Sequence, residues 1–271
     1  MSAAVPAFPN RFREVAHYYT TGRPAYPPLL ARRVATLVGG LGKARLLDLG
    51  TGPGFLAIDF APYAAEVIGI DPEPAMLAAA ARNAERAGVV ARFREGSSRS
   101  LDASLGRFRL VTIGRAFHWM DRPDVLRRLD SLLEPGGALA LFVESYPDVP
   151  ANAWRASFQQ IIDRHATGDP AADLLRTAKD HDTVLLDSPF AHLERISVLE
   201  KRRTPLERFI DRAFSFARAW GGRLDAPPPG LAAEVRAALA GFATDGAIEE
   251  VIEGQATIAF RPAEISASAG A

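Results

Sequence analysis

Short hydrophobic runs alternate with longer amphipathic stretches along the first half of the chain. The hydrophobic runs lie at residues 45–49, 66–70, 89–93, 108–113 and 138–143. Helical periodicity lies between or before most of them, at residues 28–38, 55–63, 73–88 and 122–133. This alternation predicts an α/β fold with a doubly wound, mostly parallel sheet.

The pattern changes after Ser145. Helices are expected at residues 151–180, 205–220 and 231–242, and strands at 193–199 and within 247–260. Together with the first five strands, these two predict a seven-stranded sheet. A short helix is also expected within residues 12–19, in a segment with several prolines. With no clear linker, residues 1–271 are predicted to form a single domain.

Composition and charge exclude several classes of protein. Apolar residues make up 48% and charged residues 24% of the chain, which is typical of a globular fold. The net charge is zero, so the composition does not indicate a nucleic-acid partner. Cysteine is absent, which rules out disulfides and thiolate sites and favours a cytoplasmic enzyme. Neither a membrane-spanning helix nor a metal site is expected from the residue pattern.

The sharpest local signal is the loop Asp-Leu-Gly-Thr-Gly-Pro-Gly at residues 48–54, between a predicted strand and a predicted helix. Its glycines allow a tight turn and the close approach of a ligand to the main chain. A dinucleotide fingerprint needs a small residue where Phe55 stands, and Asp48 would repel a pyrophosphate. A phosphate-binding P-loop is excluded because no Gly-Lys-Ser/Thr follows. A nicotinamide-dependent oxidoreductase and a loop that binds nothing are the alternatives.

Asp71 follows the second predicted strand, about twenty residues after the glycine loop, where an acid can accept hydrogen bonds from both ribose hydroxyls. The alternative is a helix N-cap, since Asp-Pro often begins a helix, and the two roles are compatible. Pro72 and Met76 would then flank an adenine ring. Met76 could instead fill the core.

At this point the chain resembles the class I S-adenosylmethionine-dependent methyltransferases. It is most similar to their small-molecule branch, which includes ubiquinone/menaquinone-type and trans-aconitate-type enzymes. The matching motifs are residues 48–54, Ile-Asp-Pro at 70–72, Glu-Gly-Ser at 95–97, Phe-His-Trp at 117–119, Leu-Glu-Pro-Gly-Gly at 133–137 and Tyr-x-x-x-Arg-Pro-x-Tyr-Pro at 19–27. The resemblance implies a Rossmann-like fold, S-adenosylmethionine as cofactor, and methyl transfer to an O, N or C atom of a small molecule, for example in secondary metabolism.

The resemblance also implies roles for individual residues of the cofactor site. Gly50 and Gly52 would approach the amino-acid end of the cofactor, and Asp48 would hold that region. Asp71 would bind the ribose.

Two further pairs of residues complete the implied cofactor site. Ser97 stands where the family often has an Asp beside the adenine amino group, and Ser98 would share that contact. Main-chain carbonyls near Gly114 and Arg115 would face the ammonium group.

The resemblance also implies two segments that cover the ligands. Residues 1–28 would form an N-terminal cover, from which Tyr19 and Arg23 close over the methionine carboxylate. A guanidinium suits this task because it pairs bidentately with a carboxylate. Residues 146–200 would form a helical lid over the acceptor.

Methyl transfer needs alignment and, where the acceptor carries a proton, a base. His118 is the first candidate base, since it follows the fourth strand at the edge of the sheet where ligands bind. The alternative is that His118 packs under the cofactor or orients the loop. Trp119 would form a pocket wall. His17 and Glu144 are the second and third candidates, with a solvated strand-end acid as the alternative for Glu144. The remaining histidines are given no role: His165, His181 and His192.

Aromatic side chains of the second half could line an apolar acceptor pocket, although such residues more often belong to the core. These are Trp154, Phe158, Phe190, Phe214, Phe216 and Trp220. The predicted partner is a small-molecule acceptor, with the protein a monomer or homodimer. A nucleic-acid methyltransferase is less favoured, because residues 114–117 read Gly-Arg-Ala-Phe and not Asn/Asp-Pro-Pro-Tyr/Phe. A non-catalytic cofactor-binding homologue is the other alternative.

Overall fold

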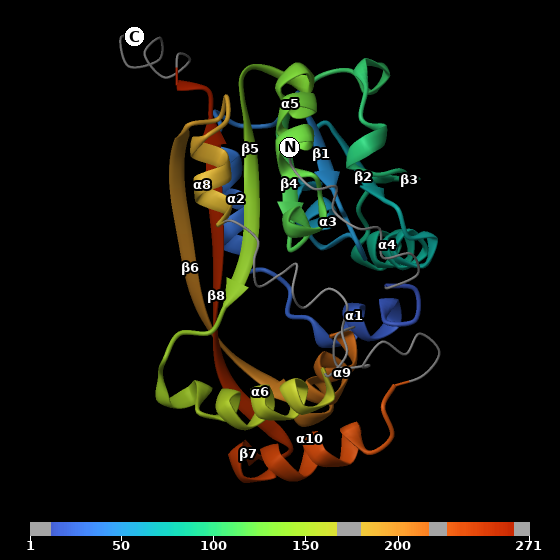
Figure 1. Cartoon of the computed structure of the whole chain (residues 1–271), viewed down its shortest axis with the longest axis vertical. Helices are drawn as coiled ribbons and strands as arrows, with labels where there is room; N and C mark the ends of the chain where they lie inside the picture. Colours follow the sequence, from blue (N-terminus) through green and yellow to red (C-terminus); the bar gives the residue numbers. More distant parts are fainter. Residues whose placement is uncertain (1–11, 167–179, 217–226, 263–271) are drawn as a thin grey trace.

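The structure is a computed structural model that describes residues 12–166, 180–216 and 227–262. Its sheet has the order β3-β2-β1-β4-β5-β8-β6, with β7 paired to β8 (Figure 1). The strands are β1 (Arg45–Leu49), β2 (Glu66–Asp71), β3 (Arg92–Glu95), β4 (Phe108–Gly114), β5 (Leu133–Ser145), β6 (His192–Pro205), β7 (Ala243–Thr244) and β8 (Ala247–Phe260). The first five are parallel, and β8 runs antiparallel to β5 and β6. The predicted fold class is confirmed; the two-residue β7 is an eighth strand that was not predicted.

Helices cover both faces of the sheet. α2 (Pro28–Leu37) and α3 (Phe55–Phe60) bury their apolar side chains against one face. α5 (Arg122–Leu132) and α8 (His181–Leu186) do so on the other face. α4 (Pro74–Ala87) packs along β2 and β3. None of the described helices is long and apolar enough to cross a membrane.

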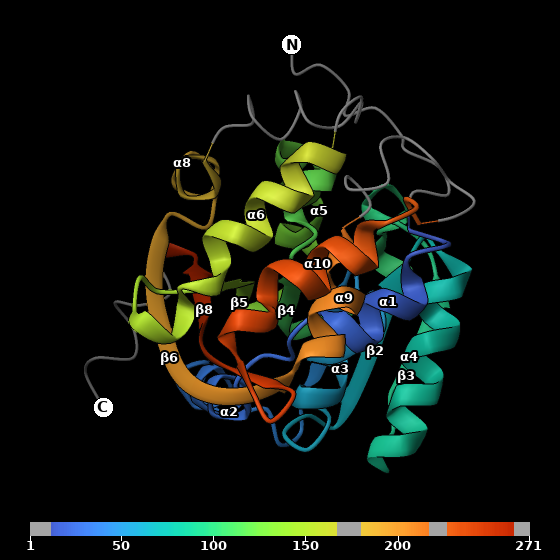
Figure 2. The same ribbon diagram turned by 90° about the horizontal axis from the view of Figure 1, so that it is seen from below.

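A second helical layer lies beyond the end of β5, where β6 and β8 continue past the sheet (Figures 1 and 2). It contains α1 (Ala16–Gly22), α6 (Trp154–His165), α9 (Leu206–Ser215) and α10 (Leu231–Leu239). Its own core is built around Trp154, Phe158 and Phe209. The predicted helical lid at 146–200 is therefore corrected: residues 192–200 belong to β6, and α1, α9 and α10 complete the layer.

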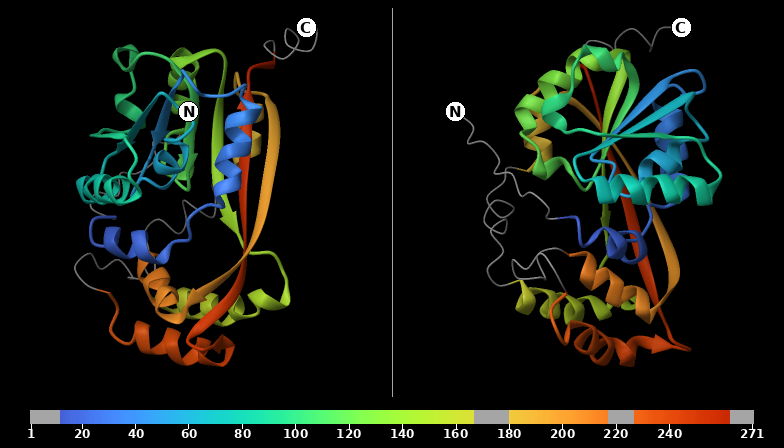
Figure 3. Two further views of the ribbon diagram at one scale, coloured as in Figure 1. Left: turned by 180° about the vertical axis from the view of Figure 1, so that it is seen from behind. Right: turned by 90° about the vertical axis from the view of Figure 1, so that its right-hand side faces the viewer.

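The N-terminal helix α1 docks on α9, between the sheet and the other helices of the layer (Figure 3). A Cβ atom at Gly22 would lie 2.2 Å from the backbone nitrogen of Arg212, so only glycine allows this contact. The described part of the predicted cover is thus joined to the helical layer. Residues 1–11 lie outside the described residues.

Several predicted boundaries were wrong. The third strand was expected at 89–93, but Gly88 ends α4 in the left-handed conformation, Val90 is exposed, and β3 begins at Arg92. The turn expected at 135–137 lies inside β5, where a shift in the β4–β5 register accommodates it. The helix expected at 151–180 ends at His165 as α6; residues 167–179 lie outside the described residues, and α8 follows at 181.

Candidate functional site

A cavity of about 740 Å³ lies at the carboxyl ends of β1, β2, β4 and β5. Residues of α1 and the end of α9 close it from the opposite side. Most of the predicted site residues line it, namely Tyr19, Arg23, Gly50, Gly52, Asp71, Met76, Gly114, Arg115 and His118. The sequence motifs of the first half therefore meet at one place in the fold.

The other predicted site residues lie outside the lining of this cavity. Asp48 borders a small recess beneath the glycine loop. Pro72 is exposed and lies outside this lining, and its contact with an adenine ring stays a prediction. Ser97 caps the short turn that follows β3, where its hydroxyl accepts from Arg99 N at 3.3 Å. The adenine contacts of Ser97 and Ser98 stay predictions.

The glycine loop is held against the neighbouring strand. The backbone nitrogens of Gly50 and Thr51 both donate to the carbonyl of Ile70, at 2.8 and 3.0 Å. Gly50 has a φ of 71°, and a Cβ there would lie 2.6 Å from the Cβ of Ala116. Only glycine therefore allows the loop to lie this close to the end of β4.

Asp71 connects the end of β2 to the glycine loop. Its Oδ2 accepts from Gly52 N and its Oδ1 from Glu73 N, both at 2.9 Å. Burial raises its pKa, while these two hydrogen bonds lower it. The N-cap of α4 is Glu73, which corrects the alternative that Asp71 itself caps the helix. Asp71 is thus a buried carboxylate at the cavity wall, as a ribose ligand requires.

The side chain of Asp48 holds the start of the glycine loop in place through two hydrogen bonds. Its two oxygens accept from the hydroxyls of Thr51 and Thr112, at 2.6 and 2.7 Å. It is buried, and this burial raises the pKa of Asp48 to about 6. Nearby Asp59 is raised to a pKa of about 7 by burial and by the charge of Asp48.

These shifts predict a pH dependence of stability. Because the folded-state pKa of Asp48 is raised, the native protein holds a proton that the unfolded chain has lost, from about pH 4 to pH 6. The free energy of unfolding should therefore fall by about 3 kcal/mol as pH rises through this window, the value that the raised pKa implies. Asp48→Asn should remove this part of the pH dependence. Urea titrations at several pH values measure this. An identical pH dependence in wild type and Asp48→Asn would contradict the shift.

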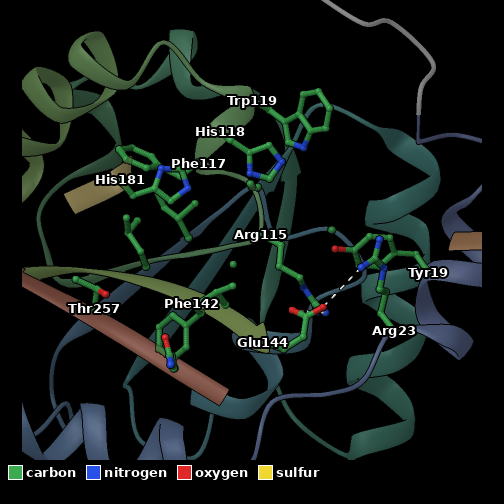
Figure 4. Close-up of a pocket in the computed structure, with 18 of the residues that line it drawn as sticks. Tyr19, Arg23, Arg115, Phe117, His118, Trp119, Phe142, Glu144, His181 and Thr257 are labelled. Carbon is green, nitrogen blue, oxygen red and sulfur yellow. Dashed lines mark ion pairs between the residues drawn. The ribbon is translucent and has the colours of Figure 1, made fainter. Parts of the chain in front are cut away.

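Two guanidinium groups and one carboxylate are buried together in the cavity (Figure 4). Arg115 Nη1 lies 3.2 Å from one oxygen of Glu144, and Arg23 Nη1 lies 3.6 Å from the other. The Arg23 guanidinium also lies 3.8 Å from the ring centroid of Phe216. Burial lowers the pKa of Arg23; in Arg115 the effect of burial is outweighed by Glu144 and Tyr19, which raise the pKa. Two positive charges share one negative charge, so the cluster lacks one anion.

The sequence reading missed this cluster. At Arg115 only the main chain was expected to matter, yet its side chain is buried and its φ is 56°, an unusual value for a residue other than glycine. Glu144 is a buried partner of two arginines rather than a solvated acid. Arg23 Nε is buried and has no hydrogen-bond partner among the described residues. An incoming anion would complete the cluster.

Two imidazole rings line the other side of the cavity. His118 lies beside Trp119, and its ring is nearly parallel to that of His181, with centroids 6.3 Å apart (Figure 4). Trp119 forms part of the wall, as predicted, and contacts Phe12 edge-on. His17 is exposed and outside the lining, which removes its basis as a candidate base.

The aromatic residues proposed for an acceptor pocket divide between core and cavity. Trp154, Phe158 and Phe214 belong to the core of the helical layer, and Phe190 to the core beneath α5. Phe216 alone of the described ones lines the cavity. Trp220 lies outside the described residues. The ring side chains that do face the cavity come mainly from the ends of β4 and β5. Helical spacing of aromatic residues could not predict them, because they do not lie on a helix of the second half.

Comparison with known proteins shows what this part of the chain is similar to. Residues 46–137 match the model of the methyltransferase domain family. This part of the chain is thus similar to a methyltransferase domain. The chain is 37% identical over 138 residues to demethylmenaquinone methyltransferase of Thermus thermophilus, covering 48% of this chain and 62% of that protein. A probable S-adenosylmethionine-dependent methyltransferase of Saccharomyces cerevisiae is 30% identical over 51% of this chain and 48% of that protein. The chain thus spans about half to two thirds of the length of these curated relatives.

Solved structures support the fold of the methyltransferase domain. An S-adenosylmethionine-dependent methyltransferase from Thiobacillus denitrificans, in complex with S-adenosylhomocysteine, superposes with a TM-score of 0.51 at 16% identity, covering 96% of this chain and all of that one. The YcgJ protein from Bacillus subtilis gives a TM-score of 0.50 at 18% identity, covering 86% and 98%. The resemblance and the Rossmann-like fold inferred from the sequence are confirmed.

Proposed function

We propose that this protein transfers a methyl group from S-adenosylmethionine to a small-molecule acceptor. The observation that carries the proposal is the position of Asp71, a buried carboxylate fixed by Gly52 N at the wall of the large cavity of a methyltransferase domain. A carboxylate at this edge of the sheet suits the ribose hydroxyls of a nucleoside ligand.

The cavity residues fit the cofactor from one end to the other. Asp71 would hold the ribose and Met76 one face of the adenine, while Gly50 and Gly52 leave room for the amino-acid end. The methionine carboxylate would supply the anion that Arg23 and Arg115 lack, and Arg23 Nε would gain its missing partner. When bound, S-adenosylmethionine supplies an activated methyl group and a good leaving group.

A pair of ligands tests this assignment. S-adenosylhomocysteine carries the amino-acid end, whereas 5′-methylthioadenosine shares its ribose and adenine but lacks the carboxylate. We expect Arg115→Met to weaken S-adenosylhomocysteine by about 10–100-fold, the usual effect of a lost charged hydrogen bond, and to leave methylthioadenosine unchanged. Asp71→Asn serves as the matched control, because it should weaken both ligands alike. Isothermal titration gives the affinities of both ligands for wild type and for the two variants.

The same titration separates the alternatives. Tighter binding of NAD than of S-adenosylhomocysteine would reject the proposal in favour of an oxidoreductase. Equal losses for both adenosyl ligands in Arg115→Met would remove that arginine from the carboxylate site. Binding without methyl transfer to any acceptor would identify a non-catalytic homologue.

The acceptor side of the cavity favours a small aromatic or otherwise flat molecule. Phe117, Trp119 and Phe142 line it, and the relative from Thermus thermophilus is named for a quinone-type substrate. We assign His118 as the base for an acceptor that carries a proton. A cytoplasmic location and a monomeric or homodimeric state are further predictions, which cell fractionation and light scattering would check.

A further inference from the structure

His181 was given no role by sequence, yet it lies in the cavity wall opposite the arginine cluster (Figure 4). It is the first residue of α8. Its ring packs edge-on against Phe117, with centroids 5.1 Å apart, and lies parallel to the ring of His118. These two ring contacts, together with a third contact from Arg122 on α5, fix the orientation of this imidazole.

The third contact determines which nitrogen of His181 carries the proton. Arg122 Nη1 lies 3.3 Å from Nδ1 of His181. A guanidinium can only donate hydrogen bonds, so Nδ1 must accept and cannot carry the proton. The neutral ring therefore has its proton on Nε2, and none of the described residues accepts a hydrogen bond from that N–H.

The neutral form of His181 is also the favoured one. Burial lowers the pKa of His181, and the positive charge of Arg122 lowers it further, against the opposing effect of Asp180 and Asp182. The ring is half-buried, and a second proton on Nδ1 would point at the guanidinium. His181 is thus held as a hydrogen-bond donor to the cavity and is a poor proton acceptor.

We propose that His181 is a positioning residue for the acceptor: its Nε2–H donates to an oxygen of a flat, apolar acceptor beside the methylated atom. The proposal rests on the proposed function, because it places this oxygen next to a bound methyl donor. It also divides the work between the two imidazoles. His181 would orient the acceptor, and His118 would stay the proposed base.

A matched pair of probes isolates the oxygen. 2-Naphthol and 2-methylnaphthalene have nearly the same shape, and only the first has an oxygen that can accept a hydrogen bond. Their affinities are measured by fluorescence in protein saturated with S-adenosylhomocysteine. We expect wild type to prefer 2-naphthol, and we expect His181→Phe to reduce that preference by about 3–10-fold, the usual range for one hydrogen bond.

Two variants distinguish donation from packing. His181→Gln keeps an N–H donor in place of Nε2–H and should retain most of the preference. His192→Phe, which changes a partly exposed histidine outside the cavity lining, should leave the preference at the wild-type value. Nitrogen-15 spectra of histidine-labelled protein should show the Nε2–H tautomer at His181 and a mixture of tautomers in Arg122→Met.

The outcomes separate this inference from the proposed function. Failure of S-adenosylhomocysteine to bind would reject the proposed function itself. Normal cofactor binding with the same preference in wild type and His181→Phe would overturn the role of His181. No binding of either probe to the cofactor-loaded protein would overturn the flat, oxygen-bearing acceptor.

Discussion

Glu250→Gln should lower the free energy of unfolding by about 3–5 kcal/mol, because it leaves a buried guanidinium without its counter-ion. Glu250 lies on β8 and is fully buried. Its two oxygens accept from Nη1 and Nη2 of Arg212 at 2.8 and 2.9 Å, and the Thr204 hydroxyl also donates to it at 2.6 Å. Arg212 Nε in turn donates to the carbonyl of Gly22 at 3.2 Å. This network joins β8, α9 and the N-terminal helix.

Urea unfolding followed by circular dichroism measures the loss. The neighbouring Glu249→Gln is the matched control, since its ion pair with Lys201 is exposed on both sides and should contribute little. Arg212→Met combined with Glu250→Leu should recover much of the stability, because apolar residues then replace both charges. A wild-type unfolding midpoint in Glu250→Gln would show that the pair does not hold the helical layer to the sheet.

The same network bears on the cofactor site. Gly22 precedes Arg23, so the contact from Arg212 to the Gly22 carbonyl fixes the point from which Arg23 enters the cavity. The helical layer thus also holds part of the cavity wall in place, because α9 anchors one of the two guanidinium groups near Glu144.

The parts of the fold and of the site that depend on residues close in sequence could be predicted from local sequence patterns. The run at 45–49 is β1 without any shift, and the glycine loop and Asp71 come together because consecutive parallel strands end at the same edge. The end of β6 was not predicted because residues 200–205 are mostly charged. β6 lies at the edge of the sheet, and every second side chain along it is exposed. Hydrophobic periodicity therefore ended that strand too early.

The missing parts of the site depend on contacts between residues far apart in sequence. Arg23 directly follows α1, Arg115 directly follows β4, and Glu144 lies near the end of β5. No spacing rule connects the three residues. His181 is a lone histidine next to residues that give no motif, and only the packing of α8 beside the segment after β4 brings it to His118. Such pairings are set by tertiary structure, which a single sequence does not reveal.

His118→Ala should lower the turnover number by about 10²–10⁴-fold, with little change in the affinity for S-adenosylhomocysteine. His118 lines the cavity beside Trp119, and its neighbour His181 is held as a donor by Arg122. We propose His118 as the group in this part of the described cavity that takes the proton of an acceptor hydroxyl. The acceptor for this assay is found by screening phenols and other flat hydroxylated molecules for label from methyl-labelled S-adenosylmethionine.

The pH profile provides the decisive measurement for His118. A base must be unprotonated, so the wild-type rate should fall toward acid pH, and this acid limb should vanish in His118→Ala. His118→Asn, which keeps a polar side chain but cannot take the proton, should lose as much activity as the alanine variant. His181→Gln should retain the acid limb, because His181 does not accept the proton. A wild-type rate in His118→Ala, or an unchanged acid limb, would show that His118 only packs beside the ligand and that the acceptor reaches the methyl group without a base from this side chain.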